Sequence, residues 1–425
     1  MKRKNILIFI FLLIFTTNLN SQETNSEQQN AISSKRHTDV IQNTNFTINK
    51  LDQLNSKYRE TNICITPNGK YLFFMSDRGG QSWSSGATMF KGKKRYDGDI
   101  WYSTKENGYW TKAKVLSDKI NTFSGEDEPN ISPNGQTVYF QSWRTWWAKT
   151  GGPYYSAEID GFNWGNPVGL GSGINDFFKD EYDKYFGYAT DGMSISPDGK
   201  TFIVACGTDY DGNLDFYISR KKNGAWSYPK RMNLSTGKEE RTIFIAADNH
   251  TIFFGSAGYG GYGGIDIFKG YLNDDGSVTD IKNIGKPFNS SRDDYGFIIT
   301  ANGEEAYFVR EGDIYFAKLE EDNQIAPGAS IVISGIYTDC NGKPLNKQLF
   351  LQKKNNNDRL NTVSNKNGKF VFSLPAENGL YEILNESMEV LISLKIDAKE
   401  NFTEYNVKLK DCSIVVPSAG ADKRH

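Results

Sequence analysis

Short apolar runs separated by polar turns recur along most of this chain, and five pairs of runs share one turn phrase. The phrase is Ile, Ser or Thr, Pro, Asn or Asp, and Gly; its closest copies occupy residues 65–70, 131–136 and 195–200. Weaker copies occupy residues 245–250 and 299–304. Proline presets the first central φ of a turn and Gly or Asn accepts a positive φ, so each copy predicts a β-hairpin. Recurrence at roughly 50 to 65 residues predicts a repeat architecture.

A second pair of apolar runs follows each hairpin. An aspartate starts the third run in four repeats, at Asp99, Asp215, Asp266 and Asp313. We interpret these aspartates as acceptors for backbone N–H groups at the start of a strand, rather than as catalytic groups. Four short antiparallel strands per repeat are typical of a propeller blade. The sequence therefore predicts an all-β, five-bladed propeller over residues 45–322, with a six-bladed ring as the alternative.

A polar phrase, built around Asn in most copies, precedes each repeat. Its copies occupy residues 54–56, 120–122, 174–176, 234–236 and 288–290. The first copy stands before the first repeat, and no copy follows the last one. We therefore expect residues 46–51 to supply the outer strand of the fifth blade. Pairing the two ends of the propeller in one sheet would leave no exposed sheet edge.

These turns, strands and linkers resemble the WD40-like (PD40) repeats of TolB-like propellers, especially those of type IX secretion and OmpA-like envelope proteins. After a linker at residues 323–330, the pattern changes to alternating strands over residues 331–413. Gly335, Asp339 and Gly342 resemble matched positions of the carboxypeptidase-regulatory-like domain. That resemblance implies a small Ig-like or transthyretin-like β-sandwich that serves as a spacer or interaction module. We expect the polar tail at residues 414–425 to be disordered.

The N-terminal residues predict export. A basic start precedes an apolar run at residues 6–15, so residues 1–21 are expected to be a signal peptide. Residues 22–44 are expected to be a disordered leader. No segment of the mature chain is apolar enough to be a transmembrane helix. We expect a periplasmic or outer-membrane-associated protein, and its net charge of −2 gives no indication of nucleic-acid binding.

The four cysteines form two groups. Cys64 and Cys206 fall on strands of blades that are not neighbours, so we expect two buried free thiols. Cys340 and Cys412 lie near the two ends of the predicted sandwich, and an oxidising compartment permits a disulfide between them. The sequence leaves their paired and unpaired forms equally open. The spacing of the cysteines matches no zinc motif.

Candidate catalytic groups are sparse. The three histidines lie in the leader, in a turn and at the terminus, and there is no Gly-x-Ser-x-Gly elbow. Acidic residues that a glycosidase could use are Glu126, Asp127, Glu128, Asp180, Glu181 and Asp183. We interpret them as solvated linkers or turns, and we expect no enzyme activity, no cofactor and no metal. Residues 209–215 resemble a calcium loop, but Leu214 and Arg220 replace its glycine and its bidentate glutamate.

The long insertions are predicted to gather on one face of the ring. Residues 79–98, 143–153 and 257–264 connect second to third strands, and residues 177–192 form a long linker between blades. Their aromatic residues are Trp83, Trp143, Trp146, Trp147, Tyr185, Tyr188, Tyr259 and Tyr262. Long loops with exposed aromatic residues favour contacts with a protein partner or a sugar. Packing of these residues against their own loops is the alternative.

Two functions follow from these observations. The first is an exported envelope protein that binds a protein partner and acts as a non-catalytic scaffold. The second is a glycan-binding or glycan-hydrolysing propeller. Hydrolysis would require two carboxylates that face the central channel about 5 to 10 Å apart.

Overall fold

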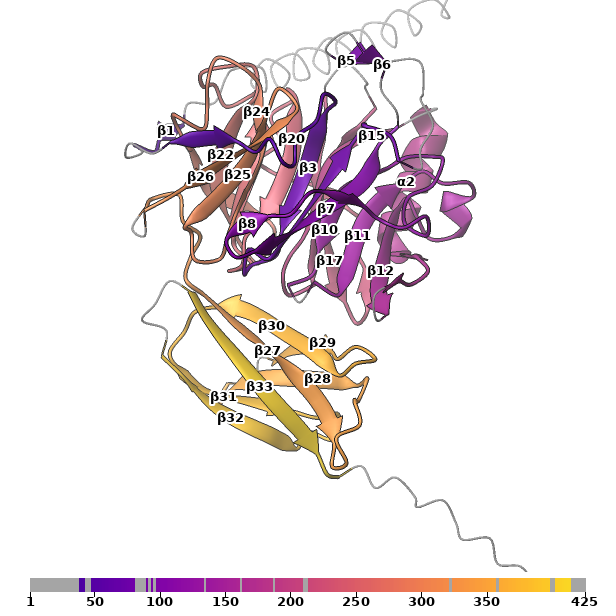
Figure 1. Cartoon of the computed structure of the whole chain (residues 1–425), viewed down its shortest axis with the longest axis vertical. Helices are drawn as coiled ribbons and strands as arrows, with labels where there is room; N and C mark the ends of the chain where they lie inside the picture. Colours follow the sequence, from indigo (N-terminus) through magenta and orange to yellow (C-terminus); the bar gives the residue numbers. More distant parts are fainter. Residues whose placement is uncertain are drawn as a thin grey trace, which may run out of the picture.

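The computed structural model describes residues 38–42, 47–80, 89–90, 93–94, 97–133, 135–160, 163–185, 188–208, 213–320, 323–356, 359–397 and 402–413. The fold is all-β: five radial sheets form a propeller, and a seven-stranded sandwich follows (Figure 1). The predicted signal peptide, most of the predicted leader and nearly all of the tail lie outside the described residues.

The first three blades each contain an inner hairpin, a third strand and an outer edge made of two short strands. Blade one comprises β3 (Glu60–Ile65), β4 (Tyr71–Ser76), β7 (Asp99–Glu106), β8 (Tyr109–Trp110) and β9 (Lys114–Val115). Blade two comprises β10 (Glu126–Ile131), β11 (Thr137–Ser142), β12 (Tyr154–Asp160), β13 (Asn163–Trp164) and β14 (Val168–Gly169). Blade three comprises β15 (Ala189–Ile195), β16 (Thr201–Gly207), β17 (Asp215–Lys222), β18 (Ala225–Trp226) and β19 (Lys230–Arg231).

The last two blades take their outermost strands from the N-terminal segment. Blade four comprises β20 (Glu240–Ile245), β21 (Thr251–Ser256), β22 (Asp266–Leu272), β23 (Val278–Asn283) and, at its edge, β1 (Asp39–Val40). Blade five comprises β24 (Asp294–Ile299), β25 (Glu305–Arg310), β26 (Asp313–Lys318) and β2 (Ile48–Lys50). A separate two-stranded hairpin, β5 (Met89–Phe90) and β6 (Lys93–Lys94), lies in the first long loop.

Closure of the ring by the N-terminal segment is confirmed. β2 pairs antiparallel with β26, with Ile48 opposite Ala317 and Lys50 opposite Tyr315. The linker residue Asn55 completes the join, because its amide donates to the carbonyl of Ile314 (2.8 Å) and accepts from the Ile314 backbone N–H (2.7 Å). Asn121 and Asn289 make the equivalent pairs of bonds with Ile100 and Ile267, so the linker phrase holds the third strands of blades one, four and five in the same way.

Two expectations about the chain ends and linkers are corrected. Asp39 and Val40, assigned from sequence to a disordered leader, form β1 and pair in parallel with β23. The second correction is α2 (Ser172–Tyr185), a helix where the sequence analysis expected a linker. Ile174, Phe177 and Phe178 bury one face of α2, as their helical spacing allows. A short 3-10 helix, η1 (Trp147–Lys149), packs beside it.

The C-terminal strands form two sheets packed face to face. One contains β27 (Ser330–Asp339), β30 (Lys369–Pro375) and β33 (Phe402–Asp411). The other contains β28 (Gln348–Lys353), β29 (Arg359–Val363), β31 (Gly379–Leu384) and β32 (Val390–Ile396). Cys340 and Cys412 form a disulfide, with Cα atoms 4.9 Å apart, whereas Cys64 and Cys206 are buried free thiols.

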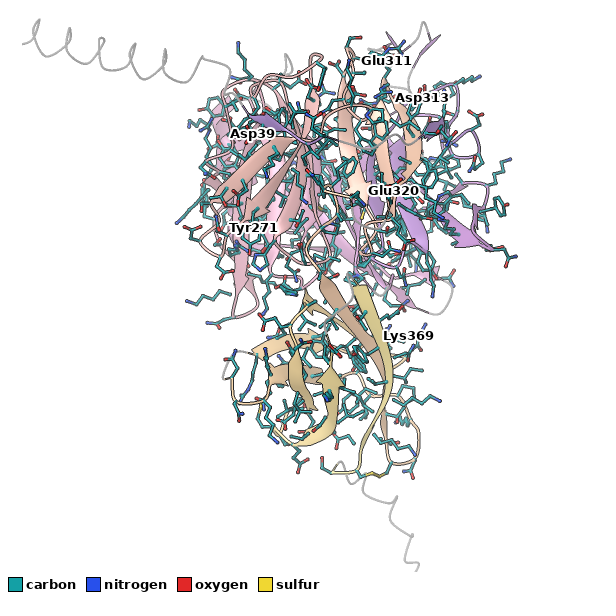
Figure 2. All side chains as sticks on the ribbon, turned by 90° about the vertical axis from the view of Figure 1, so that its left-hand side faces the viewer. Asp39, Tyr271, Glu311, Asp313, Glu320 and Lys369 are labelled. Carbon is teal, nitrogen blue, oxygen red and sulfur yellow. A yellow bond between two sulfur atoms is a disulfide. The ribbon has the colours of Figure 1, made fainter. Side chains whose placement is uncertain are left out.

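The sandwich lies against the propeller face that carries the Pro-Asn-Gly turns (Figure 1). Ser373 is buried at this interface: its hydroxyl donates to the carbonyl of Ala247 (2.9 Å), and its carbonyl accepts from the Asn249 amide (3.2 Å). Figure 2 places Asp313, the first residue of β26, at the opposite end of the propeller. The face on which strands β3, β10, β15, β20 and β24 begin is therefore directed away from the sandwich.

Among the described residues, no helix combines the length and apolar character that crossing a bilayer would require.

Candidate active site at the channel mouth

Each innermost strand carries a β-bulge at the same position. The bulges interrupt the pairing of β3, β10, β15, β20 and β24 with the next strand of their blades. One residue in each bulge has a positive φ: Asn62 (48°), Glu128 (54°), Gly192 (87°), Thr242 (43°) and Gly296 (62°). Left-handed backbone is uncommon for residues other than glycine, so its repetition around the channel marks a constrained ring. We call these five residues the bulge ring.

Members of the bulge ring contact the next blade. The Asn62 amide donates to Asp127 Oδ1 (2.8 Å), and the Thr242 hydroxyl accepts from the backbone N–H of Gly296 (2.8 Å). Position 192 has no room for a side chain, because the backbone of Thr242 is too close: a Cβ on Gly192 would lie 2.5 Å from the Thr242 Cα. The bulge ring therefore links neighbouring blades and narrows the channel.

The channel is nearly filled below its mouth. A cavity of about 10 Å³ lies among the bulge ring, and another of about 20 Å³ lies nearer the Pro-Asn-Gly turns. The smaller volume is about that of one water molecule. These two cavities are too small for a ligand such as a sugar, so we look for ligand contacts at the mouth.

The residue that precedes each bulge-ring member varies from blade to blade. These five residues, which we call the mouth ring, are Thr61, Asp127, Asp191, Arg241 and Tyr295. Tyr295 of blade five interacts electrostatically with Arg241 of blade four and Asp191 of blade three, and Asp127 of blade two interacts with Asp191. Interactions between residues of different blades indicate that these side chains converge near the axis.

Asp127 and Asp191 occupy the same position in adjacent blades but have different surroundings. Burial raises the pKa of Asp127 to about 6, against the opposing effects of the Arg59 charge and the Asn62 hydrogen bond. The Asp191 carboxylate lies 3.2 Å from Arg241 Nε and forms an ion pair with it. A carboxyl group with a raised pKa next to a carboxylate in an ion pair is an arrangement that suits general acid–base chemistry.

Glu128 and Tyr154 form a buried pair behind the mouth ring. The Tyr154 hydroxyl donates to Glu128 Oε2 (2.8 Å), and both side chains are almost fully inaccessible to solvent. Burial and the neighbouring Asp127 charge raise the pKa of Glu128 well above its ordinary range. Glu128 therefore adds a second proton-holding group next to Asp127.

Glu126, which the sequence suggested as a catalytic candidate, belongs instead to a repeated structural contact. Its carboxylate accepts from the hydroxyls of Thr122 (2.7 Å) and Ser142 (2.6 Å). Glu60 in blade one makes the same contacts with Ser56 and Ser76, and the same position is Glu240 in blade four and Asp294 in blade five. We call Glu60, Glu126, Glu240 and Asp294 the linker carboxylates. They fasten each linker to its blade.

The other acidic candidates lie away from the channel. Asp180, Glu181 and Asp183 are on α2, at the rim of blades two and three, and Asp180 accepts from the Tyr228 hydroxyl (3.3 Å). Asp215 pairs with Arg231, and Asp209 and Asp211 lie outside the described residues. Among the described residues, no group of three His, Cys, Asp or Glu side chains has a geometry that could hold a metal.

The candidate aromatic face divides into packed and exposed residues. Trp143 and Trp147 pack edge to face with ring centroids 4.9 Å apart, and both contact Tyr182 of α2. Tyr188 and Tyr259 are buried. The residues that remain on the surface are Trp146, Tyr185 and Tyr262, of which Trp146 is the most accessible at 65%. Trp83 lies outside the described residues, and whether this face binds a partner stays a prediction.

Comparison with known proteins finds distant similarities among solved structures. No family model and no curated protein matches the chain. A gluconolactonase of Xanthomonas campestris is similar at 8% identity and a TM-score of 0.36, covering 68% of this chain and 97% of its own. A luciferin-regenerating enzyme is similar at 10% identity and a TM-score of 0.33, covering 64% of this chain and 95% of its own. A candidate glycoside hydrolase of Bacteroides ovatus is similar at 12% identity and a TM-score of 0.37, covering 62% of this chain and 87% of its own.

These matches correct one expectation from the sequence. We expected a chain without enzyme activity, and the solved propellers that resemble it include a gluconolactonase and a luciferin-regenerating enzyme. At such low identities the likeness concerns the fold alone. The chemistry of this chain has to be argued from its own mouth ring.

Proposed function

We propose that the mouth ring binds and hydrolyses a glycan or a related sugar derivative. The observation that carries this proposal is the pair Asp127 and Asp191, brought to one mouth by equivalent bulges and placed in different electrostatic surroundings. In this mechanism Asp127 is the general acid, because its raised pKa keeps it protonated below about pH 6. Asp191, which forms an ion pair with Arg241, is the general base or nucleophile.

Arg59 influences the pKa of the proposed general acid, Asp127. Its positive charge lowers the pKa of Asp127, although burial outweighs that effect. Its guanidinium has a long contact with Asp77, 3.6 Å between Nε and Oδ2, and it also influences Tyr295. The electrostatic environment of the acid is thus set by a residue outside the bulge, which gives the proposal a second, independent test.

The test is release of reducing ends from a panel of polysaccharides and opening of aldonolactones, followed from pH 4 to 8. Asp127→Asn and Asp191→Asn should each lower kcat/KM by roughly 10² to 10⁴-fold, the size of a general acid–base contribution. Asp183→Asn, which changes an exposed carboxylate on α2, is the matched control and should leave the rate unchanged. Arg59→Ala should move the alkaline limb of the profile to higher pH, because a charge that lowers the pKa of Asp127 is removed.

Full activity in both aspartate variants would reject the assignment of these residues. Binding of a glycan without turnover in the wild-type protein would reject hydrolysis and leave a carbohydrate-binding propeller.

A second candidate function is docking of an envelope protein at the aromatic rim, and one observation favours it. Trp146, the residue that precedes η1, is more exposed than any aromatic side chain of η1 or α2, and the Lys149 ammonium lies 4.3 Å from its ring. Exposed Trp residues are enriched at protein interfaces. Trp146 rather than Trp147 is the residue to substitute in a pull-down, because Trp147 packs against Trp143 and Tyr182. Export to the envelope and kinship with TolB-like propellers belong to this proposal.

A further inference from the structure

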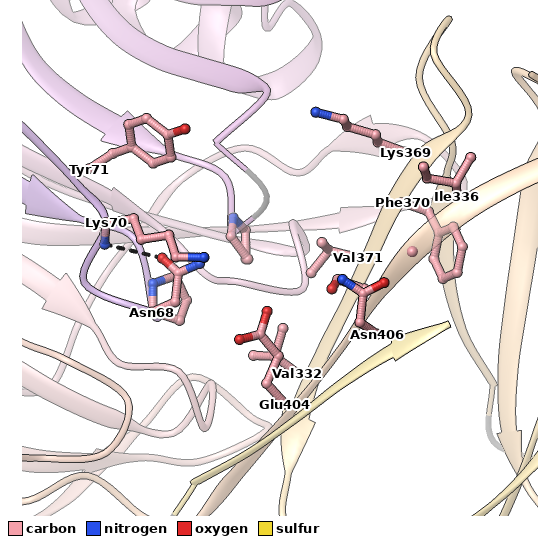
Figure 3. A pocket seen from close by; sticks show the side chains of 14 residues that line it. Asn68, Lys70, Tyr71, Val332, Ile336, Lys369, Phe370, Val371, Glu404 and Asn406 are labelled. Atoms are coloured by element: carbon pink, nitrogen blue, oxygen red, sulfur yellow. Dashed lines mark hydrogen bonds between the residues drawn. The ribbon is translucent and has the colours of Figure 1, made fainter. Parts of the chain in front are cut away.

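A cleft of about 310 Å³ lies between the propeller and the sandwich, on the face opposite the mouth ring (Figure 3). On the propeller side its walls are the first Pro-Asn-Gly turn and the start of β4. On the other side its wall is the outer face of the sheet β30-β27-β33. The side chains that give the cleft its chemistry are Asn68, Lys70, Tyr71, Lys369, Glu404 and Asn406.

The walls of the cleft are held in place by contacts elsewhere between the two domains. Besides the bonds of Ser373, the Asn365 amide donates to Gln136 Oε1 (3.0 Å). In the linker, the backbone N–H of Gly328 donates to Asp248 Oδ2 (2.7 Å). Small-molecule sites occur preferentially at such domain interfaces, in cavities of roughly 300 to 1,000 Å³. The volume of this cleft is at the lower end of that range and suits one or two sugar rings.

The charged groups of the cleft do not neutralise one another. Lys70, Lys369 and Glu404 are exposed, and in the described part of the chain none of them forms an ion pair within 4.0 Å. Figure 3 shows the Glu404 carboxylate between the two domains, with the amide of Asn406 on the sandwich side. The cleft thus presents two ammonium groups, one carboxylate and two amides to a ligand.

This mixture fits a saccharide. Hydroxyl groups both donate and accept, so they can satisfy ammonium, amide and carboxylate groups at once. The ring of Tyr71 is 37% exposed at the cleft and offers an apolar face for a sugar ring. Two positive charges against one negative charge favour a sugar that itself carries an anionic group.

An extended peptide cannot add to the central strand of the sandwich wall, β27, because neither edge of that strand is free. β27 is paired on one side with β30 and on the other with β33 along most of its length. Peptides that add to sheets do so at an unpaired edge, where backbone groups are available. At the centre of this wall, recognition therefore has to come from side chains.

We propose that the cleft between the domains is a second binding site, which takes a mono- or disaccharide carrying a carboxylate. The site is separate from the mouth ring and does not depend on the hydrolysis proposed there. It would hold an acidic sugar of a polymer while leaving the open face of the propeller free.

The experiment is titration calorimetry of the full chain with digalacturonate and with neutral galactobiose, which differ in their carboxylates. We expect digalacturonate to bind at least fivefold more tightly than galactobiose. Lys70→Ala and Lys369→Ala should each weaken digalacturonate binding about tenfold, as expected for loss of one charge-assisted contact. Lys395→Ala, at an exposed lysine on the other sheet, is the matched control and should leave the affinity unchanged.

Three results would overturn the proposal. The first is no binding of either sugar, and the second is equal loss of affinity in all three lysine variants. The third is loss of digalacturonate binding in Asp127→Asn or Arg59→Ala with full binding in the cleft variants, which would place the sugar at the mouth ring. Ser334→Trp, which fills the cleft from β27, should abolish binding while thermal unfolding shows an intact fold, and retained binding in that variant would also overturn it.

Discussion

Glu126 and Asp127 are adjacent in sequence and belong to two different regions of the propeller. Glu126 is a linker carboxylate, and its equivalents in three other blades likewise accept from a hydroxyl of the preceding linker. Asp127 is in the mouth ring, where the five blades carry five residues of four types: Thr61, Asp127, Asp191, Arg241 and Tyr295. A residue type repeated at equivalent positions serves the fold common to the blades. Chemistry specific to this chain is found where equivalent positions differ.

Substitution of a linker carboxylate is expected to have the largest effect on stability. Glu60 is fully buried, lies 2.9 Å from Arg78 Nη2 and accepts from two serine hydroxyls. Glu60→Ala leaves Arg78 without its carboxylate and should lower the free energy of unfolding by about 3 to 5 kcal/mol. Thr61→Ala, one residue further and in the mouth ring, should cost about 1 kcal/mol or less. Urea denaturation of the two variants measures both values, and equal losses would break the distinction between the regions.

A smaller effect is expected at the bulge ring, whose members follow those of the mouth ring along each innermost strand. Gly192→Ala introduces a Cβ at φ +87° and 2.5 Å from the Thr242 Cα, so it should cost about 2 to 4 kcal/mol. Gly199→Ala is the control, because Gly199 also has a positive φ but no atom lies within 4 Å of the added Cβ. It should cost about 1 kcal/mol. If the two variants unfold at the same urea concentration, close contact between blades does not constrain the bulge ring.

The smallest effect concerns Asp127 and has the opposite sign. Because the folded-state pKa of about 6 lies above the ordinary value of 3.8, the native protein holds this proton more tightly than the unfolded chain. Its contribution therefore favours folding at low pH and is lost as pH rises from about 4 to about 6. Asparagine does not ionise, so Asp127→Asn avoids this loss. Above pH 6 the free energy of unfolding of the variant should exceed that of the wild type by about 1 to 2 kcal/mol, allowing for partial solvent screening.

Thermal or urea unfolding of the two proteins at pH 4, 5, 6 and 7 checks this expectation. The difference between them should grow across that range and then become constant. A constant difference at every pH would mean that the Asp127 carboxyl is not perturbed by the fold.

Most of the propeller could be predicted because its determinants are local and repeated. The Pro-Asn-Gly turns specify the inner hairpins, and the extra linker phrase around Asn55 correctly indicated closure through residues 46–51. The α2 helix was missed although Ile174, Phe177 and Phe178 have helical spacing, because that segment was interpreted as one of the repeated linkers. β1 was missed because two residues in a polar segment carry no periodic pattern.

The candidate site was only partly predictable. Asp127 and Glu128 were among the acidic candidates, but Asp191 was not, and nothing in the sequence brings it next to Asp127. The bulge ring contains Asn, Glu, Gly, Thr and Gly, so the left-handed position has no common residue type to recognise. Aligning the five inner strands at the step before the bulge would have exposed the two aspartates. That alignment requires knowing where the bulge lies.

The joining of β2 to β26 has a consequence for biosynthesis. A nascent chain makes the segment that seals the ring before any blade, and makes its partner only with the last blade. Four complete blades therefore have to be synthesised while that short strand stays unpaired. The toroid is sealed only after Lys318 has been added, so closure of the ring comes at the end of propeller synthesis.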